Sequence, residues 1–312
     1  MITGRPCMGV IDGRVAIITG GARGIGASIS RLFASQGASL VINDLGGSPD
    51  GTGSDEGPAK QLADEIAAAG GTAVADGGDV ADVATGERLV RTAVEQFGRL
   101  DIVVNVAGIL RDRMIFNLSE ADWDEVIRVH LKGHYATVRP ASAYWREQRN
   151  PHGHYRIINF TSNSGLEGSP GQPNYAAAKM GIVGLTYSLA QALARYGVTA
   201  NAISPGAATR LTSTIPGDPL AAADDAARAA MSPDNIAPVA LYLASDRSDW
   251  LTGRVVSSMG FDVGLYENPQ QIRQLSAPGP WEYDKLAAAV ERSFRPVADG
   301  LPDSIFRPAK AR

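Results

Sequence analysis

The chain has 312 residues, enough for one or two domains, and is 44% hydrophobic and 20% charged, which excludes disordered and collagen-like chains. Its formal net charge of −4 offers no basic field for a phosphate backbone, so we expect no nucleic-acid partner. The single cysteine, Cys7, excludes an internal disulfide framework. The sequence contains neither a long apolar run nor a secretory signal, so we expect a soluble, cytoplasmic protein without a membrane span.

Seven short runs rich in β-branched residues alternate with helical patterns. Several runs are apolar at consecutive positions, which is typical of strands covered on both faces in a parallel sheet. Alternating strands and helices imply right-handed crossovers, so the sequence predicts an α/β, doubly wound, Rossmann-like fold with seven parallel strands. The predicted strands are 15–19, 40–43, 73–75, 102–105, 157–160, 200–203 and 255–257, and the predicted helices are about 24–36, 58–69, 84–97, 119–146, 173–195, 218–230, 234–244 and 281–293.

The segment after about residue 265 differs from the rest of the chain. Its many prolines leave room for only one helix, near Trp281 to Phe294. We therefore expect one domain, 1–265, followed by a C-terminal extension, 266–312. The aromatic side chains of the extension need burial, so we expect it to pack on the body or on a neighbouring subunit.

A glycine-rich turn, Thr19-Gly-Gly-Ala-Arg-Gly-Ile-Gly26, joins the first predicted strand to the first predicted helix. Glycines let the backbone approach a pyrophosphate, and the N–H groups and dipole at the helix start favour its negative charge. Because a strand precedes the turn and a helix follows it, the turn predicts a dinucleotide site. The expected contacts are Gly20, Arg23, Gly24, Ile25 and Gly26.

Asp44 ends the second strand, twenty-four residues after Gly20, near the spacing expected of an acid that binds the adenosine ribose. A carboxylate there would accept hydrogen bonds from ribose hydroxyls and repel a 2′-phosphate, which favours NAD over NADP. Arg23 favours NADP, since its guanidinium could pair with that phosphate. Asp44 could alternatively be a helix cap or loop acid.

Over residues 12 to 265 the chain resembles the short-chain dehydrogenase/reductase family, on the glycine turn and three further motifs. These motifs are Asp79-Val80, Asn105-Val106-Ala107-Gly108 and Pro205-Gly206. Val106 departs from the family's Asn-Asn-Ala-Gly motif and puts a local hydrogen bond in doubt. The threonine that the family uses for the carboxamide is displaced, leaving Thr209 or Thr212. By resemblance, the further cofactor contacts are Asp79, Val80, Asn105, Ala107, Gly108, Pro205, Gly206 and Thr209.

The resemblance also implies a catalytic group of Ser162, Tyr175 and Lys179. In a helix, the i, i+4 spacing places the phenol of Tyr175 and the ammonium of Lys179 on one face, and both are also expected to contact the cofactor. A phenol has an ordinary pKa near ~10, so we expect Lys179 and an oxidised nicotinamide to lower the pKa of Tyr175 toward neutrality. Tyr175 would then exchange the substrate proton while Ser162 binds the substrate oxygen.

His130 occupies the place of an asparagine that, in the family, holds a water linking the lysine to solvent. An imidazole could serve the same relay and, with an ordinary pKa near ~6.5, add a pH dependence; a buried structural role is the alternative. We expect His134, His152 and His154 to be ordinary helix or loop residues, and no spacing suggests a metal site.

Several details resemble one branch of the family, the dehydrogenase part of the peroxisomal multifunctional β-oxidation enzyme, which implies an NAD-dependent 3-hydroxyacyl-CoA or 17β-hydroxysteroid dehydrogenase. They are Asn43 to Gly47 with its long loop, His130, and Ala207 to Thr212. Residues 211–232 occupy the family's substrate lid, whose apolar content suits an acyl or sterol group. An arginine could meet a CoA phosphate, and the candidates are Arg111, Arg210 and Arg228.

Two other functions remain open. An NADP-dependent 3-oxoacyl-carrier-protein reductase shares the fold and the triad, and a regulatory protein could keep the dinucleotide but lack catalysis. We also expect a homodimer or homotetramer, because the helix at 173–195 carries small residues that permit close helix packing and, within the family, forms dimer faces. The alternative is that these residues, Ala176, Ala177, Ala178, Gly181 and Gly184, pack against the chain's own long helix.

Overall fold

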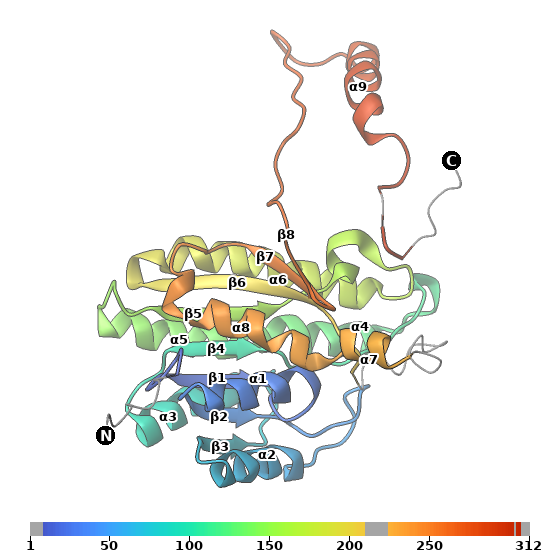
Figure 1. Ribbon diagram of the computed structural model, residues 1–312. Helices are drawn as coiled ribbons and strands as arrows, with labels where there is room; N and C mark the ends of the chain where they lie inside the picture. Colours follow the sequence, from blue (N-terminus) through green and yellow to red (C-terminus); the bar gives the residue numbers. More distant parts are fainter. Residues whose placement is uncertain (1–8, 210–223, 303, 307–312) are drawn as a thin grey trace. The chain divides into compact units, whose positions relative to one another are not determined.

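The computed structural model describes residues 9–209, 224–302 and 304–306. The chain divides into two compact units, Met1–Tyr266 and Glu267–Arg312. The first unit is built on one sheet with the order β3-β2-β1-β4-β5-β6-β7-β8 (Figure 1). The strands are β1 Val15–Thr19, β2 Ser39–Asn43, β3 Thr72–Asp76, β4 Ile102–Asn105, β5 Tyr155–Phe160, β6 Val198–Gly206, β7 Val255–Met259 and β8 Asp262–Leu265.

The doubly wound α/β sheet predicted from the sequence is confirmed, with one addition. The seven predicted strands all pair in parallel, whereas β8 pairs antiparallel with β7. A tight turn at Gly260, which has a φ of +59°, reverses the chain between these two strands. With four residues and a glycine at its third position, β8 is too short to show a clear hydrophobic pattern.

Helices cover both faces of the sheet, and the side chains of β1 explain why. Ala16 and Ile18 pack into one core cluster with helices α1, α2 and α8, whereas Val15 and Ile17 pack into a second cluster with α3, α5 and α6. A strand buried on both faces must be apolar at consecutive positions, as this one is. The helices are α1 Gly24–Ser35, α2 Gly57–Ala68, α3 Val83–Phe97, α5 Gly133–Gln148, α6 Pro173–Leu193 and α8 Ala237–Ala244.

The long helix predicted at 119–146 contains an irregularity. It begins as α4, Glu120–Ile127, where the hydroxyl of Ser119 accepts the N–H of Asp122, and continues after a π-helical turn, Arg128–Lys132, as α5. Such turns insert one extra residue into a helix and are frequent at functional sites. His130 lies in this turn, so the irregularity falls on a candidate site residue.

The helix predicted at 218–230 is represented by α7, Asp225–Ala230. Residues 211–223 of the proposed lid, which include Thr212, lie outside the described residues, as does the neighbouring Arg210. In the second unit the single predicted helix is α9, Tyr283–Ala298. Within the described residues, no helix has the length and apolar character to cross a bilayer. The packing of the extension on the body or on another subunit stays a prediction.

Candidate active site

The glycine turn follows β1 and leads into α1. Gly20 has a φ of +61°, and a Cβ at this position would lie 2.7 Å from the backbone of Ala107. A Cβ on Gly26 would lie 2.0 Å from the carbonyl oxygen of Gly20. The N-cap residue Arg23 makes no side-chain cap hydrogen bond, and the first turn of α1 carries no acidic residue. The turn therefore offers an uncapped helix N-terminus and a close backbone approach, which fits a pyrophosphate.

Asp44 follows β2 and points at the glycine turn. Its carboxylate accepts the N–H of Ala22 at 3.1 Å and the N–H of Gly46 at 2.9 Å. Arg23 donates to the carbonyl oxygens of Gly46 and Gly47, at 2.9 and 3.3 Å. The guanidinium that would favour a 2′-phosphate is thus engaged in holding the loop after β2.

The motif after β4 packs directly against the glycine turn. The N–H of Val106 donates to the carbonyl oxygen of Thr19 at 3.2 Å, and that of Ala107 approaches the Thr19 hydroxyl at 3.4 Å. These backbone contacts persist although Val106 replaces the family's asparagine. Asn105 is buried and donates from its side-chain amide to Asn159. A Cβ on Gly108 would lie 2.3 Å from Cε1 of His130, so this position requires glycine.

The remaining predicted cofactor contacts lie at the carboxyl ends of β3 and β6. Asp79 pairs with Arg128 at 2.7 Å, and Val80 is buried in a cluster that includes Tyr175. Pro205 and Gly206 end β6, and Pro205 lies opposite Ser258 of β7. The side chain of Thr209 lies 3.5 Å from the position of a Cβ on Gly24. Of the two threonine candidates, Thr209 therefore borders the glycine turn.

The predicted catalytic residues come together beside this turn. Ser162 follows β5, and its side chain is hydrogen-bonded to that of Tyr175 on α6. The Nζ atom of Lys179 lies 5.4 Å from the centroid of the Tyr175 ring and donates to the carbonyl oxygen of Phe160 at 2.8 Å. The structure thus assembles Ser162, Tyr175 and Lys179 at the carboxyl ends of the strands, where open α/β sheets bind ligands.

The pKa values of this group differ from the sequence-based expectation. Burial lowers the pKa of Lys179 from 10.5 to about 7. Burial raises the pKa of Tyr175 to about 12, while the hydrogen bond with Ser162 lowers it and the charge of Asp112 raises it. In the protein alone, burial is the largest influence on the phenol, so the pKa of Tyr175 lies above its ordinary value instead of moving toward neutrality.

His130 lies edge-on to Tyr175, with ring centroids 5.0 Å apart. Its Nε2 is 2.8 Å from the carbonyl oxygen of Ile109, and its buried Nδ1 has no hydrogen-bond partner among the described residues. Burial, aided by the charge of Lys179, holds the pKa of His130 well below 6.5. The side chain is neutral at pH 7, so it does not introduce the pH dependence that a free imidazole would.

Two other histidines have hydrogen-bonding partners of their own. His134 is buried on α5, where its Nδ1 lies 2.6 Å from the carbonyl oxygen of His130 and burial lowers its pKa to about 3.

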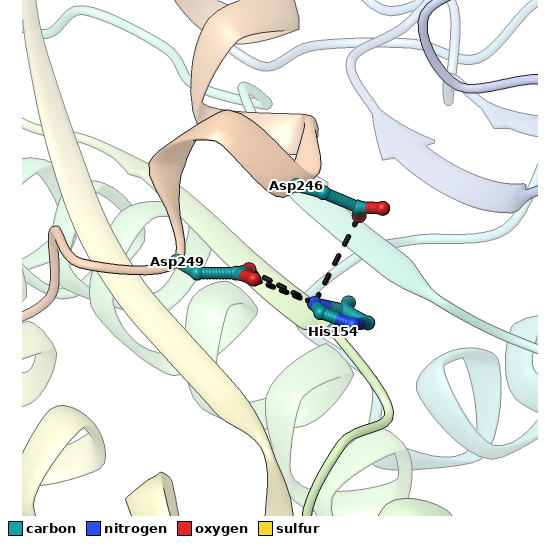
Figure 2. Close-up of side chains that lie close together, drawn as sticks. All are labelled: His154, Asp246 and Asp249. Atoms are coloured by element: carbon teal, nitrogen blue, oxygen red, sulfur yellow. Dashed lines mark hydrogen bonds and ion pairs between the residues drawn. The ribbon is translucent and has the colours of Figure 1, made fainter.

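Figure 2 shows the His154 cluster, which consists of His154, Asp246 and Asp249. Nδ1 of His154 lies 2.8 Å from Asp249, while Arg156 pairs with Asp249 and Arg14 pairs with Asp246 at 3.1 Å. The carboxylates are thus already paired with two guanidinium groups, which disfavours a metal ion there.

Sequence reasoning missed a set of contacts that join the loop after β2, the segment after β4 and the start of α6. The N–H of Leu110 donates to the carbonyl oxygen of Pro49 at 3.0 Å, and Nε of Arg111 donates to that of Asp50 at 2.9 Å. Asn174, fully buried beside Tyr175, donates to the carbonyl oxygens of Arg111 and Asp122, each at 3.1 Å. These contacts form a brace between the three segments, and the side chain of Arg111 is already hydrogen-bonded within it. The position of Asn174 directly before the tyrosine was the only sequence signal.

Comparisons with known proteins agree with this geometry. A family model described as enoyl-(acyl carrier protein) reductase matches residues 20–261. The chain is 41% identical to the hydroxyacyl-CoA dehydrogenase ChsB1 of Mycobacterium tuberculosis, over 91% of this chain and 89% of that protein. It is 42% identical to the peroxisomal multifunctional enzyme type 2 of Drosophila melanogaster, over 82% of this chain but only 40% of that enzyme.

A solved structure, a short chain dehydrogenase from Mycobacterium avium, is similar with a TM-score of 0.83 and 44% identity, covering 96% of this chain and all of that one. Fold, site geometry and extended sequence identity therefore point the same way. The chain belongs to the short-chain dehydrogenase/reductase family, whose members are oxidoreductases that act on CH–OH groups.

Proposed function

We propose that the chain is an NAD-dependent dehydrogenase of secondary alcohols, with a 3-hydroxyacyl-CoA or hydroxysteroid-type lipid as its substrate. The observation that carries this proposal is the assembly of Ser162, Tyr175 and Lys179 beside the glycine turn. The substrate class is supported by the identity to a hydroxyacyl-CoA dehydrogenase along nearly its whole length.

In the proposed reaction each residue has a defined task. Tyr175 takes the proton of the substrate hydroxyl during oxidation and returns it during reduction, while Ser162 donates a hydrogen bond to the substrate oxygen. Lys179 supplies positive charge near the phenol and would hold the nicotinamide ribose. When bound, the nicotinamide ring supplies hydride transfer and, in its oxidised form, positive charge. His130, neutral and edge-on to Tyr175, orients the phenol ring.

The family uses nicotinamide dinucleotides, and for this chain we propose NAD in preference to NADP. Asp44 lies at the end of β2 and is directed at the glycine turn, where it would meet the adenosine ribose. Arg23, the main argument for NADP, is bound to two loop carbonyl groups. By family position, the predicted contacts at β3, β4 and β6 would complete the cofactor site.

Turnover assays test the proposal. The purified protein is assayed with NAD+ and NADP+ against a 3-hydroxyacyl-CoA, a hydroxysteroid and a simple secondary alcohol. We expect NAD-dependent oxidation of a lipid substrate, and we expect Tyr175→Phe to lose at least about 10²-fold in kcat while binding NAD nearly as well. Turnover of that variant at the wild-type rate would contradict the assignment. Nucleotide binding without any turnover would support a regulatory protein, and turnover of the acyl substrate only with NADP+ would support a carrier-protein reductase.

We further propose that the chain forms a homo-oligomer through α5 and α6. These helices line an open groove that includes Tyr135, Leu185, Leu189 and Leu193. On α6, a Cβ at Gly184 would meet no atom within 4 Å, so its surface is free for a close helix contact. Gly181 instead faces Leu131 of the same chain.

Sedimentation tests this proposal. We expect the wild-type protein to sediment as a dimer or tetramer, and Gly184→Arg to dissociate it because a large charged side chain blocks close helix packing. A monomer at micromolar concentration would contradict the proposal.

A further inference from the structure

A chain of hydrogen bonds connects Asp112 to the proposed catalytic serine. The carboxylate of Asp112 accepts the side-chain amide N–H of Gln172 at 2.8 Å, and the amide oxygen of Gln172 accepts the hydroxyl of Ser164 at 2.7 Å. The backbone N–H of Ser164 donates to the hydroxyl oxygen of Ser162 at 3.2 Å. Three separate segments are thus joined: the loop after β4, the start of α6 and the π-helical turn Ser164–Gly168 after β5.

The chain lies in the interior, although one of its atoms is unsatisfied. Ser164 and Gln172 are buried, with 4% and 9% of their surfaces exposed. Asp112 is half-buried, and its Oδ1 is inaccessible without a hydrogen-bond partner among the described residues. A buried carboxylate oxygen without a partner costs stability. An arrangement that only closed a loop would not need a charged residue at this position, which points to a functional role.

The charge of Asp112 acts on the same phenol as the serine. Asp112 raises the pKa of Tyr175, whereas the hydrogen bond with Ser162 lowers it. Lys179 and His130 also face the Tyr175 ring. Burial raises the pKa of Asp112, against the effects of Gln172 and the charge of Arg113.

We propose that Asp112 is a positioning residue of the dehydrogenase reaction, which fixes Ser162 through Gln172 and Ser164 and acts on Tyr175 through its charge. This inference rests on the proposed function. The Ser164 N–H occupies one lone pair of the Ser162 oxygen, which leaves the serine proton for the phenol or the substrate oxygen. The chain therefore sets the direction of the serine hydroxyl before substrate arrives.

Two variants separate the charge from the hydrogen bonds. Asp112→Asn removes the negative charge but keeps an oxygen that can accept from Gln172. Gln172→Leu keeps the charge but breaks the chain. Glu120→Gln, at an exposed site in the first turn of α4, is the matched control for loss of one carboxylate. For each protein, kcat is measured against pH in both reaction directions, together with NAD binding and the melting temperature.

We expect Asp112→Asn to move the midpoint of the pH profile to lower pH by roughly half a unit or more, because a nearby negative charge no longer opposes ionisation of the phenol. The midpoint moves the same way in both directions, since oxidation needs the phenolate and reduction needs the phenol. Gln172→Leu should lower kcat about tenfold or more with a smaller shift of the midpoint. Glu120→Gln should change neither quantity.

The outcomes distinguish this inference from the proposed function. If wild type and the control turn over but Asp112→Asn keeps the wild-type midpoint, the inference is wrong and the dehydrogenase assignment stands. If wild type itself shows no turnover, the assignment fails. A loss of kcat in Asp112→Asn without a shift would show a merely structural role and would overturn the inference. Should Gln172→Leu not fold, Ser164→Ala tests the same link while leaving the backbone N–H in place.

Discussion

Lys179 is a buried ionisable side chain, and its replacement by methionine should stabilise the protein at neutral pH while abolishing turnover. Burial lowers the pKa of this side chain from 10.5 to about 7, and only 3% of its surface is exposed. Because the folded state disfavours the charged form, folding loses stability from this group as the pH falls below 10.5, and the loss is complete below the folded pKa. Linkage over these two values gives a cost of about 4 kcal/mol at pH 7 and about 2 kcal/mol at pH 9.

The variant also loses the hydrogen bond from Lys179 to the Phe160 carbonyl oxygen, which contributes about 1 to 3 kcal/mol and changes little with pH. Lys179→Met should therefore be more stable than wild type by about 1 to 3 kcal/mol at pH 7. The advantage should shrink by about 2 kcal/mol between pH 7 and pH 9.

Urea unfolding of nucleotide-free protein, followed by circular dichroism at several pH values, measures this difference. Contributions from all other titrating groups largely cancel between variant and wild type. The exposed lysine Lys60 on α2 provides the matched control, Lys60→Met. A stability difference for Lys179→Met that stayed constant from pH 7 to pH 9 would refute the reasoning, because the buried side chain would then not be discharged in this range.

Three further predictions concern the same site and the His154 cluster. Gly108→Ala should lower stability by about 1 to 3 kcal/mol, because its Cβ would meet the ring of His130. In urea unfolding, the added change His130→Ala should restore part of that loss. If the losses of the two single variants simply added in the double variant, this contact would be contradicted. Asp44→Asn should raise the NADP to NAD ratio of kcat/KM roughly tenfold or more, since repulsion of a 2′-phosphate is removed; an unchanged ratio would dissociate Asp44 from cofactor choice. Treatment with EDTA should leave turnover and melting temperature unchanged, because guanidinium groups already pair with the carboxylates of the His154 cluster, and a drop in melting temperature would indicate a bound metal.

The parts of the site that sequence predicts are those encoded by neighbouring residues. The glycine turn lies between one strand and the next helix, and Tyr175 and Lys179 are one helical turn apart, so local spacing was sufficient. The π-helical turn at His130 was not predictable, because the insertion is stabilised by a contact with Ile109, twenty-one residues away. The chain from Asp112 to Ser162 likewise depends on three segments that meet only in the folded protein.

The pKa of Tyr175 shows a second limit. The residue types predict an activated phenol, but the depth at which α6 buries the pair reverses the balance in the protein alone. Burial depends on the whole fold, so a motif gives the partners of a titratable group and not the strength of their interaction.

The brace between the loop after β2 and the segment after β4 constrains how this enzyme can be altered. Pro49 and Asp50 hold Leu110 and Arg111, and the same loop carries the carbonyl groups bound by Arg23. Grafting this loop from a relative to change nucleotide choice would therefore also disturb the segment after β4, which lies at the alcohol-binding end of the proposed site. Evolution toward another coenzyme in this lineage would require paired changes at both ends, and a chimera exchanging only one of them should be a poor catalyst with either nucleotide.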